Sequence, residues 1–186
     1  MPEPGRVALF GGSFNPPHLG HQMAILFVLE TEPVDQLWMI PTYRHPFGKQ
    51  LAPFADRLEM CRRAARGFGE RVLVSEVERE LGQESSRTYD TVVELRRRHP
   101  GISLRLVIGE DILAERHAWH RWDDLVALAP PIVLRRSLGA GARAGLVELP
   151  SISSTEVRNA LAAGHSAVPL VPAAVMDYIA QRGLYH

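Results

Sequence analysis

The sequence of 186 residues has one cysteine, no net charge and no long apolar run. A single cysteine excludes an internal disulfide framework and fits a reducing compartment. Lys plus Arg and Asp plus Glu number 21 each, so the chain lacks the bulk positive charge that binds nucleic acid non-specifically. No apolar stretch reaches the roughly 20 residues of a membrane-spanning helix, and no charged segment followed by an apolar one opens the chain. We therefore expect a soluble, cytoplasmic protein that binds neither nucleic acid nor membrane.

Length and apolar patterning predict one α/β domain, residues 1–186, with a sizeable core. Short β-prone runs alternate with segments of helical spacing, and right-handed crossovers between such strands give a Rossmann-like, open, mainly parallel sheet with helices on both faces. The predicted strands cover residues 7–10, 36–40, 72–74, 104–108, 131–134 and 146–149. The predicted helices cover residues 19–31, 54–66 and 88–98, a segment bearing Trp119 and Trp122, the residues after Ser153 up to Gly164, and residues 172–183. The Gly- and Ala-rich segment 135–145 is expected to be a loop.

The most informative stretch follows the first strand and reads GGSFNPPHLGHQ, residues 11–22. Gly11 and Gly12 end the strand and remove side chains where a ligand approaches the backbone. Helical spacing begins at Leu19, and a helix N-terminus attracts anions through its free N–H groups and its dipole. His18 and His21 lie three residues apart at this point, so both imidazoles can project toward one anion. A single histidine here would more often be a helix cap, but the pair beside two glycines indicates an anion site.

A second informative stretch, ISSTEVR, covers residues 152–158. Ser153 and Glu156 have the spacing of a capping box at the start of a helix. Ser154, Thr155 and Arg158 share one face of that helix, where hydroxyls, free N–H groups and a guanidinium together can hold a phosphate. On these residues alone, a well-capped helix without a ligand is an equally good interpretation.

Glycine, proline or charged residues also follow other predicted strands. Gly11, Pro41, Gly109 and Arg135 each come directly after one, and the carboxylate of Asp111 lies just beyond Gly109. Ligands of open parallel sheets bind outside the carboxyl ends of the strands, where the strand order reverses. The sequence therefore predicts one cleft at this edge of the sheet.

The segment His18-Leu19-Gly20-His21 resembles the H-x-G-H signature of a nucleotidyltransferase superfamily. The fuller GGSFNPPHLGH, the ISSTEVR segment and the closing Gly-Leu-Tyr resemble bacterial nicotinate mononucleotide adenylyltransferases, over essentially the whole chain. This resemblance implies transfer of the adenylyl group of ATP to nicotinate mononucleotide, with release of pyrophosphate, in NAD biosynthesis. It also implies catalysis by His18, His21 and Arg158, and a Mg²⁺ ion held mainly by the ATP phosphates. The ATP-binding residues that it implies are Gly11, Gly12, Ser13, Phe14, His18, His21, Gly109, Asp111, Ser153, Ser154, Thr155 and Arg158.

The resemblance also implies a group of residues around the acceptor nucleotide: Lys49, Thr88, Tyr89, Trp119, Arg135 and Arg136. Trp119 matches a tryptophan that stacks on the pyridine ring, and plain core packing is its alternative role. Near the expected pyridine pocket the chain departs from the family pattern at two places: SRT at residues 86–88 replaces the usual S-Y-T, and P-P-H-K is present only as HPFGK at 45–49. A carboxylate needs N–H donors or a cation, whereas an amide also needs an acceptor. The many Arg and Lys residues nearby favour nicotinate.

Three alternatives stay open on the sequence. The acceptor can be nicotinamide mononucleotide, or pantetheine phosphate as in a related family, with the same chemistry. A regulatory module that binds nucleotide without turnover keeps the fold but releases no pyrophosphate.

His117 and His120 have a spacing found in zinc sites, but no third ligand accompanies them, so we expect no metal site built by the protein alone. The sequence is compatible with a homo-oligomer and does not define one.

Overall fold

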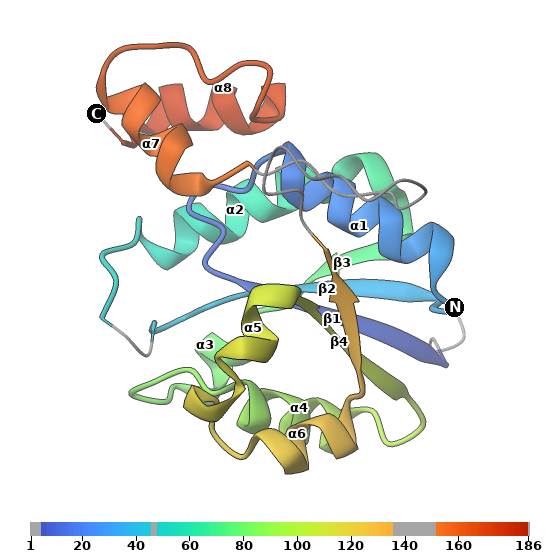
Figure 1. The fold of residues 1–186 in the computed structure, drawn as a ribbon. Helices are drawn as coiled ribbons and strands as arrows, with labels where there is room; N and C mark the ends of the chain where they lie inside the picture. Colours follow the sequence, from blue (N-terminus) through green and yellow to red (C-terminus); the bar gives the residue numbers. More distant parts are fainter. Residues whose placement is uncertain (1–4, 46–47, 136–151, 186) are drawn as a thin grey trace.

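In a computed structural model that describes residues 5–45, 48–135 and 152–185, five parallel strands form one open sheet (Figure 1). The strands are β1 (Arg6–Gly12), β2 (Gln36–Pro41), β3 (Val72–Val74), β4 (Ser103–Gly109) and β5 (Pro131–Leu134), in the order β3-β2-β1-β4-β5. Each pair of neighbouring strands is parallel. This confirms the predicted Rossmann-like sheet. The predicted strand at residues 146–149 lies outside the described residues.

Five helices match the predicted ones: α1 (Leu19–Thr31), α2 (Phe54–Ala65), α4 (Thr88–Arg98), α7 (Ser154–Ala162) and α8 (Ala173–Arg182). The described part also contains α3 (Val77–Leu81), α5 (Glu110–Ala114), α6 (Trp122–Leu128) and the 3₁₀ helices η1 (Arg66–Arg71) and η2 (Arg116–Ala118). The prediction of one helix bearing both tryptophans is wrong. Trp119 is extended, and Arg121 has a left-handed backbone (φ 54°) that separates Trp119 from the start of α6. Among the described residues, no helix is long and apolar enough to cross a membrane.

Side chains of β1 alternate between two buried layers. Ala8 and Phe10 face the side covered by α1 and α2, whereas Val7 and Leu9 face the side covered by α4 and α6 (Figure 1). A strand buried on both faces has to be apolar throughout, which is why the sequence shows a continuous run there. Cys61 of α2 belongs to the first layer and is fully buried, and burial raises the pKa of its thiol. This agrees with its predicted role in the core.

The last two helices form a third layer on the outer side of α2 (Figure 1). Val157 of α7 and Val175 and Ile179 of α8 pack on Met60 of α2, all of them buried. The hydroxyl of Tyr178 adds a polar tie, because it donates to the buried carboxylate of Asp56 at 2.8 Å. This packing brings the start of α7 to the loop that follows β1.

Strand order reverses between β1 and β4, so the residues after these two strands face each other across the sheet edge. Gly12 ends β1, and Gly109 ends β4 and precedes α5. Such a reversal leaves a crevice that the connecting helices do not fill. The fold therefore places both glycines at the predicted binding edge.

Candidate active site

A cleft of about 980 Å³ opens at this edge of the sheet. Its volume is at the upper end of the range for small-molecule sites. Seven of the predicted ATP- and acceptor-binding residues line it: Gly11, Gly12, Ser13, Lys49, Thr88, Asp111 and Trp119. Two loops form much of one wall, the loop after β2 with Thr42, His45 and Lys49, and the residues 85–88 that lead into α4.

The two glycines at the end of β1, Gly11 and Gly12, have different structural roles. A Cβ on Gly12 would lie 3.2 Å from the ring of Phe14, which folds back under the turn with a left-handed backbone (φ 45°) and is buried. A Cβ on Gly11 would meet nothing within 4 Å. Gly12 is therefore needed for packing of the turn, while Gly11 faces open space at the cleft.

The two histidines lie at the start of α1, with their imidazole rings in contact. His18 precedes the first residue of the helix and is buried, and its ring centroid is 3.8 Å from that of His21. The Nδ1 atom of His21 accepts the backbone N–H of His18 at 3.1 Å. Nδ1 is then unprotonated, so the neutral ring carries its hydrogen on Nε2. His21 thus caps its helix through Nδ1, and Nε2 is the donor atom of its neutral ring.

Gly20 explains why the two rings can approach. A Cβ there would lie 3.0 Å from Nδ1 and 3.1 Å from Cε1 of His18, and 3.4 Å from Cβ of Ile152. The ring of Phe14 lies 4.9 Å from that of His21, centroid to centroid, and links the histidines to the glycine turn of the cleft. Gly20 was not among the predicted site residues, although the H-x-G-H pattern contains it.

The two predicted anion-binding segments meet. The Ser154 hydroxyl donates to the carbonyl of Pro16 at 3.0 Å, and Nη1 of Arg158 donates to the carbonyl of Asn15 at 2.8 Å. Nη2 of Arg158 also donates to the Thr155 hydroxyl at 3.2 Å.

The predicted capping box at the start of α7 is confirmed. The hydroxyl of Ser153 accepts the backbone N–H of Glu156, the third residue of the helix, at 3.1 Å. The helix cap and the contact with the loop after β1 therefore coexist.

Three residues that support this loop were not recognised in the sequence as part of the site. Arg57 is 1% exposed, and its guanidinium donates to the carbonyls of Ser13 and Ala52, both at 2.9 Å. The Oδ1 atom of Asn15 accepts the N–H of Ala52 at 3.0 Å and the hydroxyl of Tyr185 at 2.8 Å. Burial lowers the pKa of Arg57 and raises that of Tyr185. The only sequence signals were an arginine on a mostly apolar helix face and the tyrosine of the closing Gly-Leu-Tyr.

The predicted acceptor residues are not all at the cleft. Lys49, Thr88 and Trp119 line it, and Trp119 also packs against the core layer under α4 and α6, so both of its proposed roles fit the geometry. Tyr89 instead packs beneath the guanidinium of Arg121, whose Cζ lies 4.2 Å from the ring centroid. Arg135 lies 3.7 Å from the carboxylate of Glu110, both of them exposed, and Arg136 lies outside the described residues.

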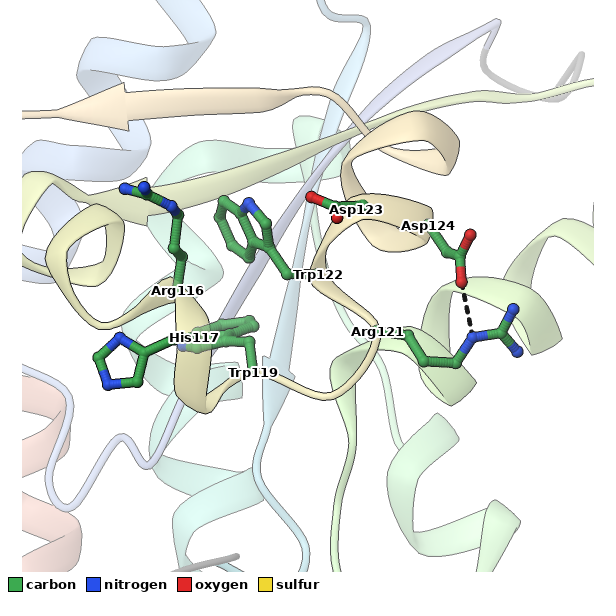
Figure 2. A pocket seen from close by; sticks show the side chains of 7 residues that line it. All are labelled: Arg116, His117, Trp119, Arg121, Trp122, Asp123 and Asp124. Carbon is green, nitrogen blue, oxygen red and sulfur yellow. Dashed lines mark hydrogen bonds and ion pairs between the residues drawn. The ribbon is translucent and has the colours of Figure 1, made fainter.

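A second pocket, of about 450 Å³, borders the cleft at η2 and α6 (Figure 2). It shares His117, Trp119 and Arg121 with the cleft. Figure 2 shows Arg121 turned toward Asp124, to which its Nε donates at 2.7 Å. Trp119 and Trp122 meet edge to face at 5.9 Å. The wall beside Trp119 is therefore aromatic, with charged groups at its rim.

Comparisons with known proteins by family, by sequence and by fold agree with one another. The model of the cytidylyltransferase-like family matches residues 9–160. A protein of Anaeromyxobacter sp. (strain K) is 48% identical over 96% of both chains, and one of Myxococcus xanthus is 40% identical over 97% of this chain and 94% of its own. Both carry the name "Probable nicotinate-nucleotide adenylyltransferase". The solved structure of Plasmodium falciparum nicotinic acid mononucleotide adenylyltransferase complexed with NaAD has the same fold, with a TM-score of 0.79, 19% identity and 97% of each chain covered.

Proposed function

The chain belongs to the cytidylyltransferase-like family, and we propose that it transfers the adenylyl group of ATP to nicotinate mononucleotide. The products are nicotinate adenine dinucleotide and pyrophosphate. The observation that carries the proposal is the contact between the start of α7 and the loop after β1, which leads into the histidine-bearing start of α1, beside a cleft at the strand-order reversal. The names of the two bacterial relatives support the choice of substrates.

The proposed reaction does not need a general base. The attacking group is a phosphate monoester, which is anionic at neutral pH, so no side chain has to remove a proton from it. Catalysis can then come from positioning and from donors aimed at the charge on the transferred phosphorus group. In the proposed mechanism, Nε2 of His21 donates to the α-phosphate, and His18 contacts the phosphates beside it.

The start of α7 holds the leaving pyrophosphate in this mechanism. Ser153 and Thr155 offer hydroxyls, and Ser154, whose hydroxyl donates to Pro16, offers its backbone N–H. Arg158 offers those of its five N–H groups that do not bond Asn15 or Thr155. A guanidinium held at one side by the carbonyl of Asn15 and the hydroxyl of Thr155 is fixed in orientation before the nucleotide arrives, which lowers the entropic cost of binding.

The remaining ATP residues lie around the glycine turn and the end of β4. Gly11 gives room for the nucleotide to approach the backbone, and Gly12 and Phe14 shape the turn beneath it. Ser13 and Asp111 line the cleft, and Gly109 precedes α5, in which Asp111 lies. We assign the Asp111 carboxylate to the hydroxyls of a nucleotide ribose.

The acceptor side of the cleft, defined here as Thr42, His45, Lys49 and residues 85–88, favours an acidic ligand. Thr88 begins α4, and the residue before it, Arg87, makes no side-chain capping bond to the first N–H groups of that helix. Uncapped N–H groups at a helix start, with Lys49 on the same wall, suit a carboxylate. Trp119 is assigned to stacking on the pyridine ring, whereas roles for Tyr89, Arg135 and Arg136 at the acceptor stay predictions.

Mg²⁺ fits this site as an ion bound through the phosphates of the nucleotide. Among the residues described, no group of three or more His, Cys, Asp or Glu side chains is placed to hold a metal ion. Magnesium commonly keeps its waters and is bound through substrate phosphates, with few protein ligands. When bound there, it would neutralise charge on the β- and γ-phosphates.

The proposal is tested by measuring pyrophosphate release from Mg-ATP with nicotinate mononucleotide. We expect release that requires both substrates and yields the dinucleotide in equal amount. ATP binding without pyrophosphate release would instead identify a nucleotide-binding module without turnover.

Gly20→Ala is expected to lower kcat about tenfold with little change in thermal stability. The new Cβ pushes the His18 ring out of its position, while alanine gains about 1 kcal/mol of helix propensity over glycine, which offsets the strain. Gly67→Ala is the matched control, because a Cβ at Gly67 meets nothing within 4 Å. Wild-type turnover in the Gly20 variant would show that the position of His18 does not matter.

Tyr185→Phe is expected to lower kcat/KM for ATP about five- to tenfold, because the loop that carries His18 loses a hydrogen bond to Asn15 worth about 1 kcal/mol. Tyr178→Phe is the matched control: it removes a hydroxyl bond of the same length from Tyr178 of α8 to Asp56, in a contact between α8 and α2. The control should lose stability without losing activity. Equal kinetics in the two variants would contradict a role of Tyr185 at the site.

A further inference from the structure

A buried carboxylate, Glu78 of α3, joins the two loops that form the acceptor side of the cleft. The residue is 8% exposed and also lines the cleft. It accepts the backbone N–H of Tyr43 at 2.9 Å and a hydrogen bond from the hydroxyl of Ser86. Tyr43 lies in the loop after β2, and Ser86 lies two residues before α4.

Ser86 continues the connection. Its hydroxyl oxygen accepts the backbone N–H of Arg44 at 3.1 Å, and its own N–H donates to the carbonyl of Arg44 at 3.0 Å. The hydroxyl hydrogen is then directed to Glu78. One carboxylate and one hydroxyl thus fix the distance between Thr42–His45 and the residues that begin α4.

Stability does not account for a carboxylate at this place. Burial raises the pKa of Glu78, although the bonds from Ser86 and Tyr43 and the charge of Arg57 act in the opposite direction. A carboxyl whose pKa is raised on folding stabilises the fold most when it is protonated, and that contribution is lost as the pH rises through its folded pKa. The fold therefore disfavours the charged form of this carboxyl relative to water, so a gain in stability from its charge does not explain why a carboxyl group stands here.

We propose that Glu78 is a positioning residue that sets the shape of the acceptor site by holding the loop after β2 against the start of α4. The inference rests on the proposed function, because it assigns this side of the cleft to the acceptor nucleotide. Among the described residues, Glu78 and Ser86 form no hydrogen bond with Asn15, Arg57 or Arg158, which support the ATP side, although the charge of Arg57 acts on Glu78. Loss of the hydrogen bonds of Glu78 should therefore affect the acceptor much more than ATP.

The experiment measures kcat and both KM values for Glu78→Gln, Ser86→Ala and the double variant. An amide has only one oxygen for the two donors, and alanine removes the relay altogether. We expect KM for nicotinate mononucleotide to rise about fivefold or more in each single variant, with kcat and KM for ATP within about twofold of wild type. The two changes act on one connection, so the double variant should show much less than the product of the single effects.

Two controls separate this role from a structural one. Glu80→Gln removes a carboxylate two residues away on α3 that pairs with Arg98 at the surface, and it should change neither KM. Ser86→Thr keeps a hydroxyl and should keep most of the acceptor affinity. The melting temperature of the Glu78→Gln variant should stay close to that of wild type, because the desolvation cost of the carboxylate disappears together with one of its two hydrogen bonds.

The outcomes are distinguishable. An unchanged acceptor KM in Ser86→Ala and Glu78→Gln would overturn the proposal, as would equal rises in both KM values together with a lower melting temperature. If Glu78→Gln does not fold, Ser86→Ala alone decides in the same way. Failure of the proposed function would appear earlier, as an absence of pyrophosphate release from the wild-type protein.

Discussion

Replacing His21 with alanine is expected to lower kcat by about 10²–10³-fold, the usual effect of losing one donor to the developing charge of a transition state. The bond from the His18 N–H to Nδ1 of His21 leaves Nε2 as the donating atom of the neutral ring. The measurement is pyrophosphate release at saturating Mg-ATP and nicotinate mononucleotide. The fold should persist, because the residue contributes a cap worth about 1 kcal/mol and its ring is only partly buried, at the edge of the core beside Phe10 and Phe14.

The cap itself provides the control. His21→Glu keeps an acceptor at the N3 position, where glutamate suits a capping box, but offers no donor to a phosphate. We expect this variant to melt at or above the temperature of the alanine variant and to turn over no faster. Recovery of turnover together with stability would mean that His21 acts only as a cap, and the catalytic assignment would be abandoned.

Arg158→Ala is expected to lower kcat/KM for ATP by about 10²-fold or more. The guanidinium is the charged group of α7 that touches the histidine-bearing loop, and its loss removes both a phosphate ligand and the bond to the Asn15 carbonyl. Steady-state kinetics with ATP varied, together with a melting curve, measure the two effects separately.

Arg158→Lys keeps the charge but loses the fork that reaches Asn15 and Thr155 at once. We expect an intermediate value of kcat/KM, nearer to alanine than to wild type. If the alanine variant kept wild-type kinetics, the start of α7 would be a capped helix that packs on the loop, as the alternative interpretation of its sequence holds.

Local sequence patterns were enough to predict the sheet and both candidate anion-binding segments. The run 7–10 is apolar because both faces of β1 are buried, and the glycines after it mark where that strand ends. The capping box at Ser153 is likewise a local pattern, and it forms as predicted. The H-x-G-H spacing indicated the histidine pair, although the reason for its central glycine became clear only from the ring of His18.

The contacts between these segments were not predictable in the same way. The bond from Tyr185 to Asn15 joins residues 170 positions apart, and that from Arg158 to Asn15 spans 143. Neither leaves a periodic signal, because one tyrosine or arginine in a helical pattern has many possible partners. Helix α3 was also missed, since five residues are too few for a helical period, and with it the position of Glu78 at the cleft.

The most direct test of the proposed activity is a competition between equal concentrations of nicotinate mononucleotide and nicotinamide mononucleotide, with limiting Mg-ATP and separation of the two dinucleotides. The uncapped start of α4 and the Lys49 side chain favour the acid, so nicotinate adenine dinucleotide should exceed the amide product at least about tenfold. Equal amounts of the two products, an excess of the amide product, or neither dinucleotide would contradict the assignment of the acceptor.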